Sequence, residues 1–133
     1  MRKWLVFSVV IFVLLLGACS FHTLKPDENS MILSFKNNSQ FDFYTLEITT
    51  GLYTTGISYA DGSKIKKGEL LQFEIVDQKD MNLEGEATFQ FAIINKEGKF
   101  PLNNVSLELA TNREYTFEIS GDAINDAELR RIK

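Results

Sequence analysis

Residues 87–94, Ala87-Thr-Phe-Gln-Phe-Ala-Ile-Ile94, are the most apolar strand-like run that follows residue 30. Ala87, Phe89, Phe91 and Ile93 occupy alternate positions in this run. Because successive side chains of a β-strand point to opposite faces of the sheet, this period of two predicts a strand with one face in the core. Its high apolar content favours a central position in a sheet. The turn-forming residues 95–98, Asn-Lys-Glu-Gly, predict a hairpin directly after it.

The same alternation recurs on both sides of this run. Clusters of Gly, Asn, Asp and Lys separate the alternating segments, as expected for turns. The predicted strands lie at Met31–Phe35, Phe41–Thr49, Leu70–Val76, Lys99–Leu102 (Pro101 marking an edge), Val105–Leu109 and Tyr115–Ile119. Residues 124–133 fit a short helix or a final edge strand equally well.

This spacing predicts an all-β domain, an antiparallel immunoglobulin-like β-sandwich of about seven strands. A small closed β-barrel is the alternative architecture. The term immunoglobulin-like describes architecture only, because residues 20–133 contain neither paired cysteines nor a tryptophan.

The N-terminus has the order of a secretory signal peptide. Arg2 and Lys3 precede an apolar run from Trp4 to Leu16, and the small residues Gly17 and Ala18 follow. As a helix, thirteen residues extend about 20 Å, which is short of the roughly 30 Å hydrocarbon core of a bilayer. A helical signal peptide is therefore predicted in place of a membrane-spanning anchor.

The segment Leu16-Gly-Ala-Cys19 resembles the lipobox of bacterial lipoprotein precursors. That resemblance covers residues 1–19 and implies a diacylglyceryl group on Cys19, with cleavage between Ala18 and Cys19. Cys19 is the only cysteine of the chain, so no intramolecular disulfide is available. Two acyl chains give stable membrane attachment. The expected location is the extracytoplasmic face of the cell membrane.

These features divide the chain into a signal peptide (1–18), a lipidated cysteine with a flexible tether (19–29), and a sandwich domain (30–133). The formal charge of the whole chain is −4. Loss of Arg2 and Lys3 leaves twelve basic and eighteen acidic residues, a net charge of −6. An acidic chain is repelled by nucleic acid, so a protein partner is expected and a nucleic-acid partner is not.

The sandwich domain lacks two of the side chains that most often serve as catalytic nucleophiles, bases or transition-metal ligands. The only histidine, His22, precedes it, and residues 30–133 contain no cysteine. Catalysis by Ser-His-Asp or Cys-His groups and thiolate or imidazole metal sites are therefore not expected. No cofactor and no enzymatic activity are predicted. Two acidic groups could still bind Ca²⁺ or act as an acid–base pair: Asp77, Asp80, Glu84 and Glu86, and then Asp122, Asn125, Asp126 and Glu128. Their spacing is not that of an EF-hand loop, so solvated charged loops are the preferred interpretation.

Residues 50–59 combine threonine, glycine and tyrosine, a composition that suits recognition surfaces. The candidate binding residues are Tyr53, Thr54, Thr55 and Tyr59. An alternating strand with both tyrosines packed on the core has the same pattern.

The sequence thus predicts a membrane-anchored binding or accessory module without catalysis. The alternatives are an inhibitor of a basic envelope-attacking enzyme, similar to lysozyme inhibitors, and a carboxylate-based hydrolase.

Overall fold

The computed structural model describes residues 23–51 and 53–133. Within this part of the chain, short strands build two packed sheets, and only one 3-10 turn, η1, is helical. The elements are β1 Ser30–Asn37, β2 Thr45–Thr50, β3 Tyr53–Ile57, β4 Leu70–Val76, β5 Glu86–Asn95, β6 Gly98–Pro101, β7 Val105–Glu108, β8 Arg113–Ser120, η1 Ile124–Asp126 and β9 Glu128–Arg131.

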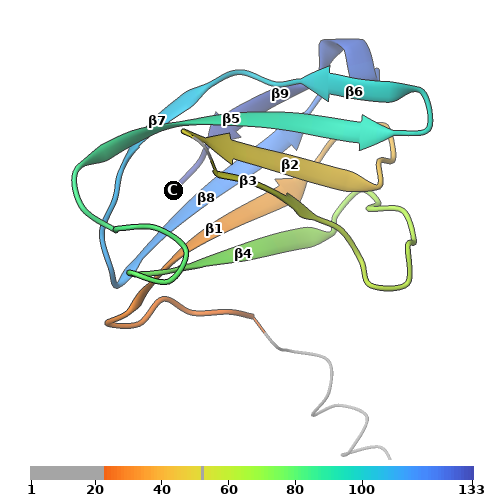
Figure 1. Cartoon of the computed structure of the whole chain (residues 1–133). Helices are drawn as coiled ribbons and strands as arrows, with labels where there is room; N and C mark the ends of the chain where they lie inside the picture. Colours follow the sequence, from red (N-terminus) through yellow and green to blue (C-terminus); the bar gives the residue numbers. More distant parts are fainter. Residues whose placement is uncertain (1–22, 52) are drawn as a thin grey trace, which may run out of the picture.

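The two sheets lie face to face (Figure 1). One has the strand order β4-β1-β8-β9, and the other has the order β3-β2-β5-β6, with β7 also pairing with β5. Both sheets keep free edges, so the predicted sandwich is confirmed and the closed-barrel alternative is not adopted. The described residues form nine strands where about seven were predicted. One pair departs from antiparallel order, because β1 and β8 run parallel, with Met31 opposite Arg113.

The core forms where the alternating side chains of the two sheets meet. Phe35 of β1, Phe91 of β5 and Phe117 of β8 are in mutual contact, with ring centroids 5.4–5.8 Å apart. Phe89 and Ile93 are also fully buried. The period-two prediction for β5 is therefore confirmed. Phe91 joins the sheets, since its neighbours Phe35 and Phe117 belong to the opposite one.

Several predicted boundaries shift. The strand predicted from Phe41 begins only at Thr45, and Phe43 instead forms an isolated bridge to Ile65. Residues 124–133 take both predicted forms in succession, η1 and then β9. The hairpin at residues 95–98 is confirmed, with Asn95 paired to Gly98, and β6 lies at the sheet edge as Pro101 indicated.

Candidate functional site

The candidate residues of the 50–59 stretch fall on and just after β3. This strand pairs with β2 from Tyr53 opposite Thr50 to Ile57 opposite Leu46. Leu46 and Ile48 are buried, so their partners Ile57 and Thr55 belong to the inward side of the sheet, together with Tyr53. Thr54 faces outward and is exposed. The candidates therefore point to opposite sides of one edge strand.

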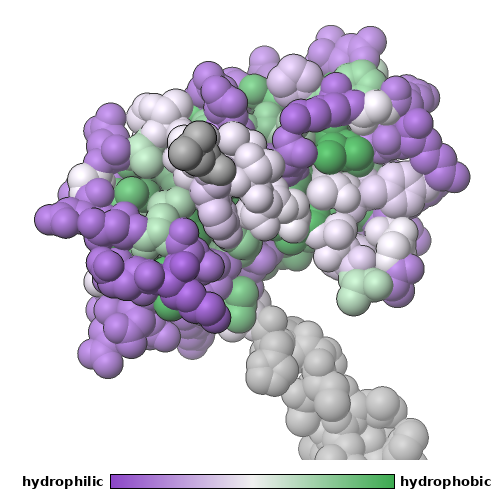
Figure 2. Space-filling view, in the orientation of Figure 1, coloured by the Kyte–Doolittle hydropathy of each residue, from purple (hydrophilic) through white to green (hydrophobic). Residues whose placement is uncertain are grey.

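β3 differs from the other edge strands of the described sandwich. Natural sheet edges commonly carry charges or proline, which discourage pairing with another chain. β3 has neither, whereas the other three edges have at least one charged residue: Glu74 on β4, Lys99 with Pro101 on β6, and Glu128, Arg130 and Arg131 on β9. In Figure 2 the region of β3 is a pale, near-neutral strip between strongly hydrophilic areas. Its unpaired side is the least protected edge of the domain.

Tyr59 lies two residues beyond β3 and has a structural contact that Tyr53 lacks. Its ring packs, partly buried, against the hydrophobic core. Its hydroxyl donates a hydrogen bond to Glu69, which also accepts the backbone N–H of Lys66 at 3.0 Å. Burial, followed by the hydrogen bond and the negative charge of Glu69, raises the pKa of Tyr59 to about 12. Tyr59 therefore holds the loop of residues 58–69 against the core. The candidate recognition surface is then limited to the residues of β3.

The outward side of the five-stranded sheet holds a shallow depression of about 270 Å³. It lies beside the end of β6, where residues 102–104 connect β6 to β7. Lys99 forms an ion pair with Glu47 across it, and its polar lining includes Thr49, Gln90 and Asn104. This depression adjoins β2 and is one strand away from β3. Sequence analysis did not find it, because its residues come from three strands and a loop.

Two members of the first acidic group, Asp77 and Asp80, accept hydrogen bonds from the local backbone. Asp77 Oδ1 accepts the N–H of Leu83 at 2.9 Å, and Asp80 Oδ2 accepts that of Val76 at 2.7 Å. These bonds stabilise the loop between β4 and β5. No group of three or more His, Cys, Asp or Glu residues suited to a metal ion occurs in residues 23–51 and 53–133.

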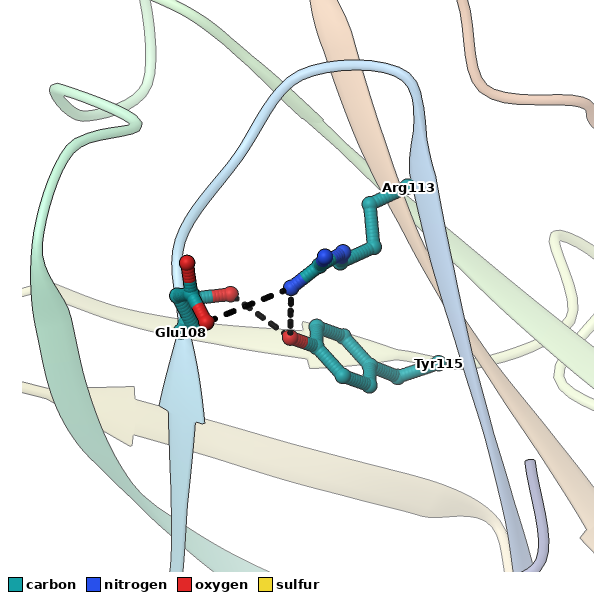
Figure 3. Close-up of polar contacts among 3 residues, drawn as sticks. All are labelled: Glu108, Arg113 and Tyr115. Carbon is teal, nitrogen blue, oxygen red and sulfur yellow. Dashed lines mark hydrogen bonds and ion pairs between the residues drawn. The ribbon is translucent and has the colours of Figure 1, made fainter.

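A further polar cluster lies at the turn between β7 and β8 (Figure 3). The hydroxyl of Tyr115, a nearly buried residue, donates to the carbonyl of Glu108 at 2.8 Å, and Arg113 Nη1 donates to the same hydroxyl at 3.0 Å. The hydrogen bond to Tyr115 raises the pKa of the Arg113 guanidinium. A second guanidinium, that of Arg131, stacks over the Tyr115 ring, 4.6 Å from its centroid. The cluster secures the turn, and no spacing in the sequence signals it.

The predicted lipidation and cleavage residues, Cys19 and Ala18, lie outside the described residues. No helix in the described part of the chain is long and apolar enough to cross a membrane.

Comparisons with known proteins bear on the fold alone. No protein-family model matches the sequence, and no curated protein matches it significantly. Among solved structures, the chain is similar to a protein from Eubacterium rectale determined by NMR, with a TM-score of 0.51 and 9% identity over 84% of this chain and 96% of that one. It also aligns with pneumolysin at a TM-score of 0.40 and 10% identity, over 77% of this chain and 23% of that one. At such low identity, the similarity to the Eubacterium rectale protein shows only that the sandwich has a counterpart of similar length. The alignment with pneumolysin is too weak to support a conclusion.

Proposed function

We propose that the chain is a lipid-anchored extracytoplasmic lipoprotein whose sandwich is a binding module without catalysis, and that it receives an extended segment of a protein partner along β3. The observation that carries the proposal is the unprotected edge of β3, within the stretch whose composition suits recognition. The anchor is proposed from the segment Leu16–Cys19 and the apolar run before it.

An extended peptide binds to such an edge by adding a strand to the sheet. Main-chain hydrogen bonds then supply affinity, and alternate side chains supply specificity. Exposed Thr54 and Gly56 leave the outward side of the edge open, while Tyr53 and Thr55 offer half-buried contacts on the inward side. This exposure of β3 supports strand addition at its unpaired side.

An inhibitor of a basic envelope-attacking enzyme is the second candidate function. The net charge of −6 for residues 19–133 supports it, because opposite charge raises the rate of encounter with a basic protein. The net charge does not indicate where on the domain a partner would bind, whereas the unpaired edge of β3 does. For this reason the general binding module is preferred.

The anchor is tested by substitution of the predicted lipidated residue. Cys19→Ser should abolish incorporation of labelled fatty acid and leave an uncleaved or released precursor. A variant that is labelled and fractionates with membranes like the wild type would contradict lipidation at Cys19.

The binding module is tested by capture from membranes with an immobilised 20–133 fragment. A discrete partner is expected, and a basic one would favour the inhibitor. Activity on glycan or peptide substrates without any partner would instead favour a hydrolase and contradict the proposal.

A further inference from the structure

The chain just before β1, predicted as a flexible tether, is hydrogen-bonded to the domain over residues 24–29. Gln72, on β4, makes two hydrogen bonds to the backbone of Leu24. Its Oε1 accepts the N–H of Leu24 at 2.7 Å, and its Nε2 donates to the carbonyl of Leu24 at 3.3 Å. Farther along, the carbonyl of Asp27 accepts the N–H of Asn112 at 2.8 Å, and that of Asn29 accepts the N–H of Asp77 at 2.8 Å. We name residues 23–29 the strap.

The strap lies on the outer face of the four-stranded sheet. Residues 23–25 line a hollow of about 260 Å³ together with outward-facing Ser34, Gln72 and Thr116, which come from β1, β4 and β8. Gln72 also donates to Ser34 Oγ at 3.0 Å. Ser34 is 3% exposed although it points away from the core. Gln72 thus connects the strap to a polar network on this face.

The strap shortens the free connection to the predicted anchor. From Cys19 to Ser30, eleven residues could extend roughly 38 Å, whereas the five residues from Cys19 to Leu24 extend at most about 17 Å. We infer that the strap, fastened by Gln72, holds the outer face of the four-stranded sheet toward the lipid surface and presents the five-stranded sheet, with β3, to partners. This inference rests on the proposed lipid anchor at Cys19.

The surface chemistry of this face suits proximity to a bilayer without independent binding to it. Leu24 and Leu70, two large apolar residues that are 44% and 43% exposed, lie together at the hollow. Glu74 and Glu114 belong to the same face, and carboxylates are repelled by anionic headgroups. The anchor therefore keeps the outer face of the four-stranded sheet next to the lipid surface. The five-stranded sheet lies on the opposite side of the sandwich (Figure 1).

The inference is tested by energy transfer with the full lipidated chain in phosphatidylcholine vesicles that contain an acceptor dye on a headgroup. A donor dye is placed on one introduced cysteine, either Lys36→Cys, on the outward side of β1, or Thr88→Cys, on the outward side of β5. Cys19 is acylated and does not compete for the dye. Because packed sheets lie about 10 Å apart and side chains add to this separation, transfer from position 36 should exceed that from position 88 at least twofold.

Substitution of Gln72 tests whether the strap causes the difference. Gln72→Ala should remove most of it, whereas Gln72→Glu, which keeps an acceptor for the Leu24 N–H but loses the donor to the Leu24 carbonyl, should remove only part of it. Gln90→Ala is the matched control, an exposed glutamine on the outward side of β5 without contact to the strap, and should leave the difference intact. Equal transfer from both positions in the parent chain, or a difference that persists undiminished in Gln72→Ala, would overturn the inference.

Flotation of every variant with the vesicles separates this result from failure of the anchor. Chains that float but show no difference in transfer contradict the orientation alone. Chains that do not float contradict the lipid anchor and, with it, the inference.

Discussion

β5 and β3 belong to the same sheet and are separated only by β2, yet they differ in length, in pairing and in burial. β5 has ten residues and is paired on both sides, with β2 along one and with β6 and β7 along the other. Its inward side carries Phe89, Phe91 and Ile93, all buried. β3 has five residues, is paired only with β2, and has no fully buried side chain.

Strand composition thus determines which strand stabilises the fold and which strand stays available to pair with another chain. Buried aromatic side chains make β5 costly to alter, because each removes a large apolar surface from water. The threonine and glycine residues of β3 contribute little packing and leave one row of backbone groups without a partner strand. An edge of this kind can change its contacts without loss of the fold.

Truncation of a core residue in β5 should reduce stability more than any other substitution considered. Phe91→Ala should lower the free energy of unfolding by about 3–5 kcal/mol, because it leaves a cavity where the two sheets meet. Gln90→Ala, its outward-facing neighbour, should change it by less than about 0.5 kcal/mol. Chemical unfolding of both variants measures the two values. Similar losses would show that the two sides of β5 do not differ in burial.

Tyr59 should give an intermediate effect. Its ring is only partly buried against the core, so Tyr59→Ala should cost about 1–3 kcal/mol, less than a full core truncation. Tyr59→Phe should retain part of this stability, because it removes only the hydrogen bond to Glu69. A thermal melt in which Tyr59→Ala matches the wild type would return Tyr59 to the recognition surface.

Tyr59 should also titrate late. Its pKa is raised from 10.0 to about 12, so the neutral phenol is the form that the fold stabilises. This contribution is complete below pH 10 and is lost as the pH rises from 10 toward 12. Phenolate absorbance should contain a component with a midpoint near pH 12 that is missing in Tyr59→Phe. A titration curve that lacks this component in the wild type would contradict the contact with Glu69.

Tyr53 should show the smallest change in stability. Tyr53→Ala truncates a half-buried side chain at an edge, and its cost should stay below about 1 kcal/mol. Partner capture should nevertheless weaken, because interface tyrosines often contribute more than 1 kcal/mol to binding. A stability loss equal to that of Tyr59→Ala would place Tyr53 in the core and remove the distinction between β3 and the loop.

The sequence predicted the sandwich because period-two alternation reports directly which face of a strand is buried. It predicted β5 best, since four alternate apolar residues leave only one choice for the buried face. The parallel pairing of β1 with β8 could not be predicted, because alternation carries no information about neighbouring strands. The contact of Tyr59 with Glu69 and the contact of Gln72 with Leu24 depend on residues 10 and 48 positions apart, which only the folded chain brings together.

Binding of a partner along the free edge of β3 is tested by placing a charge on that edge. Thr54→Lys puts an edge-protecting charge on the outward side of β3, and Thr49→Lys makes the same change on β2, directly opposite Thr54. Capture of the membrane partner by the immobilised domain should fall at least tenfold for Thr54→Lys, a loss of about 1.4 kcal/mol of binding, and should change little for Thr49→Lys. Both variants should unfold like the wild type. Unchanged capture by a folded Thr54→Lys domain would contradict binding along β3.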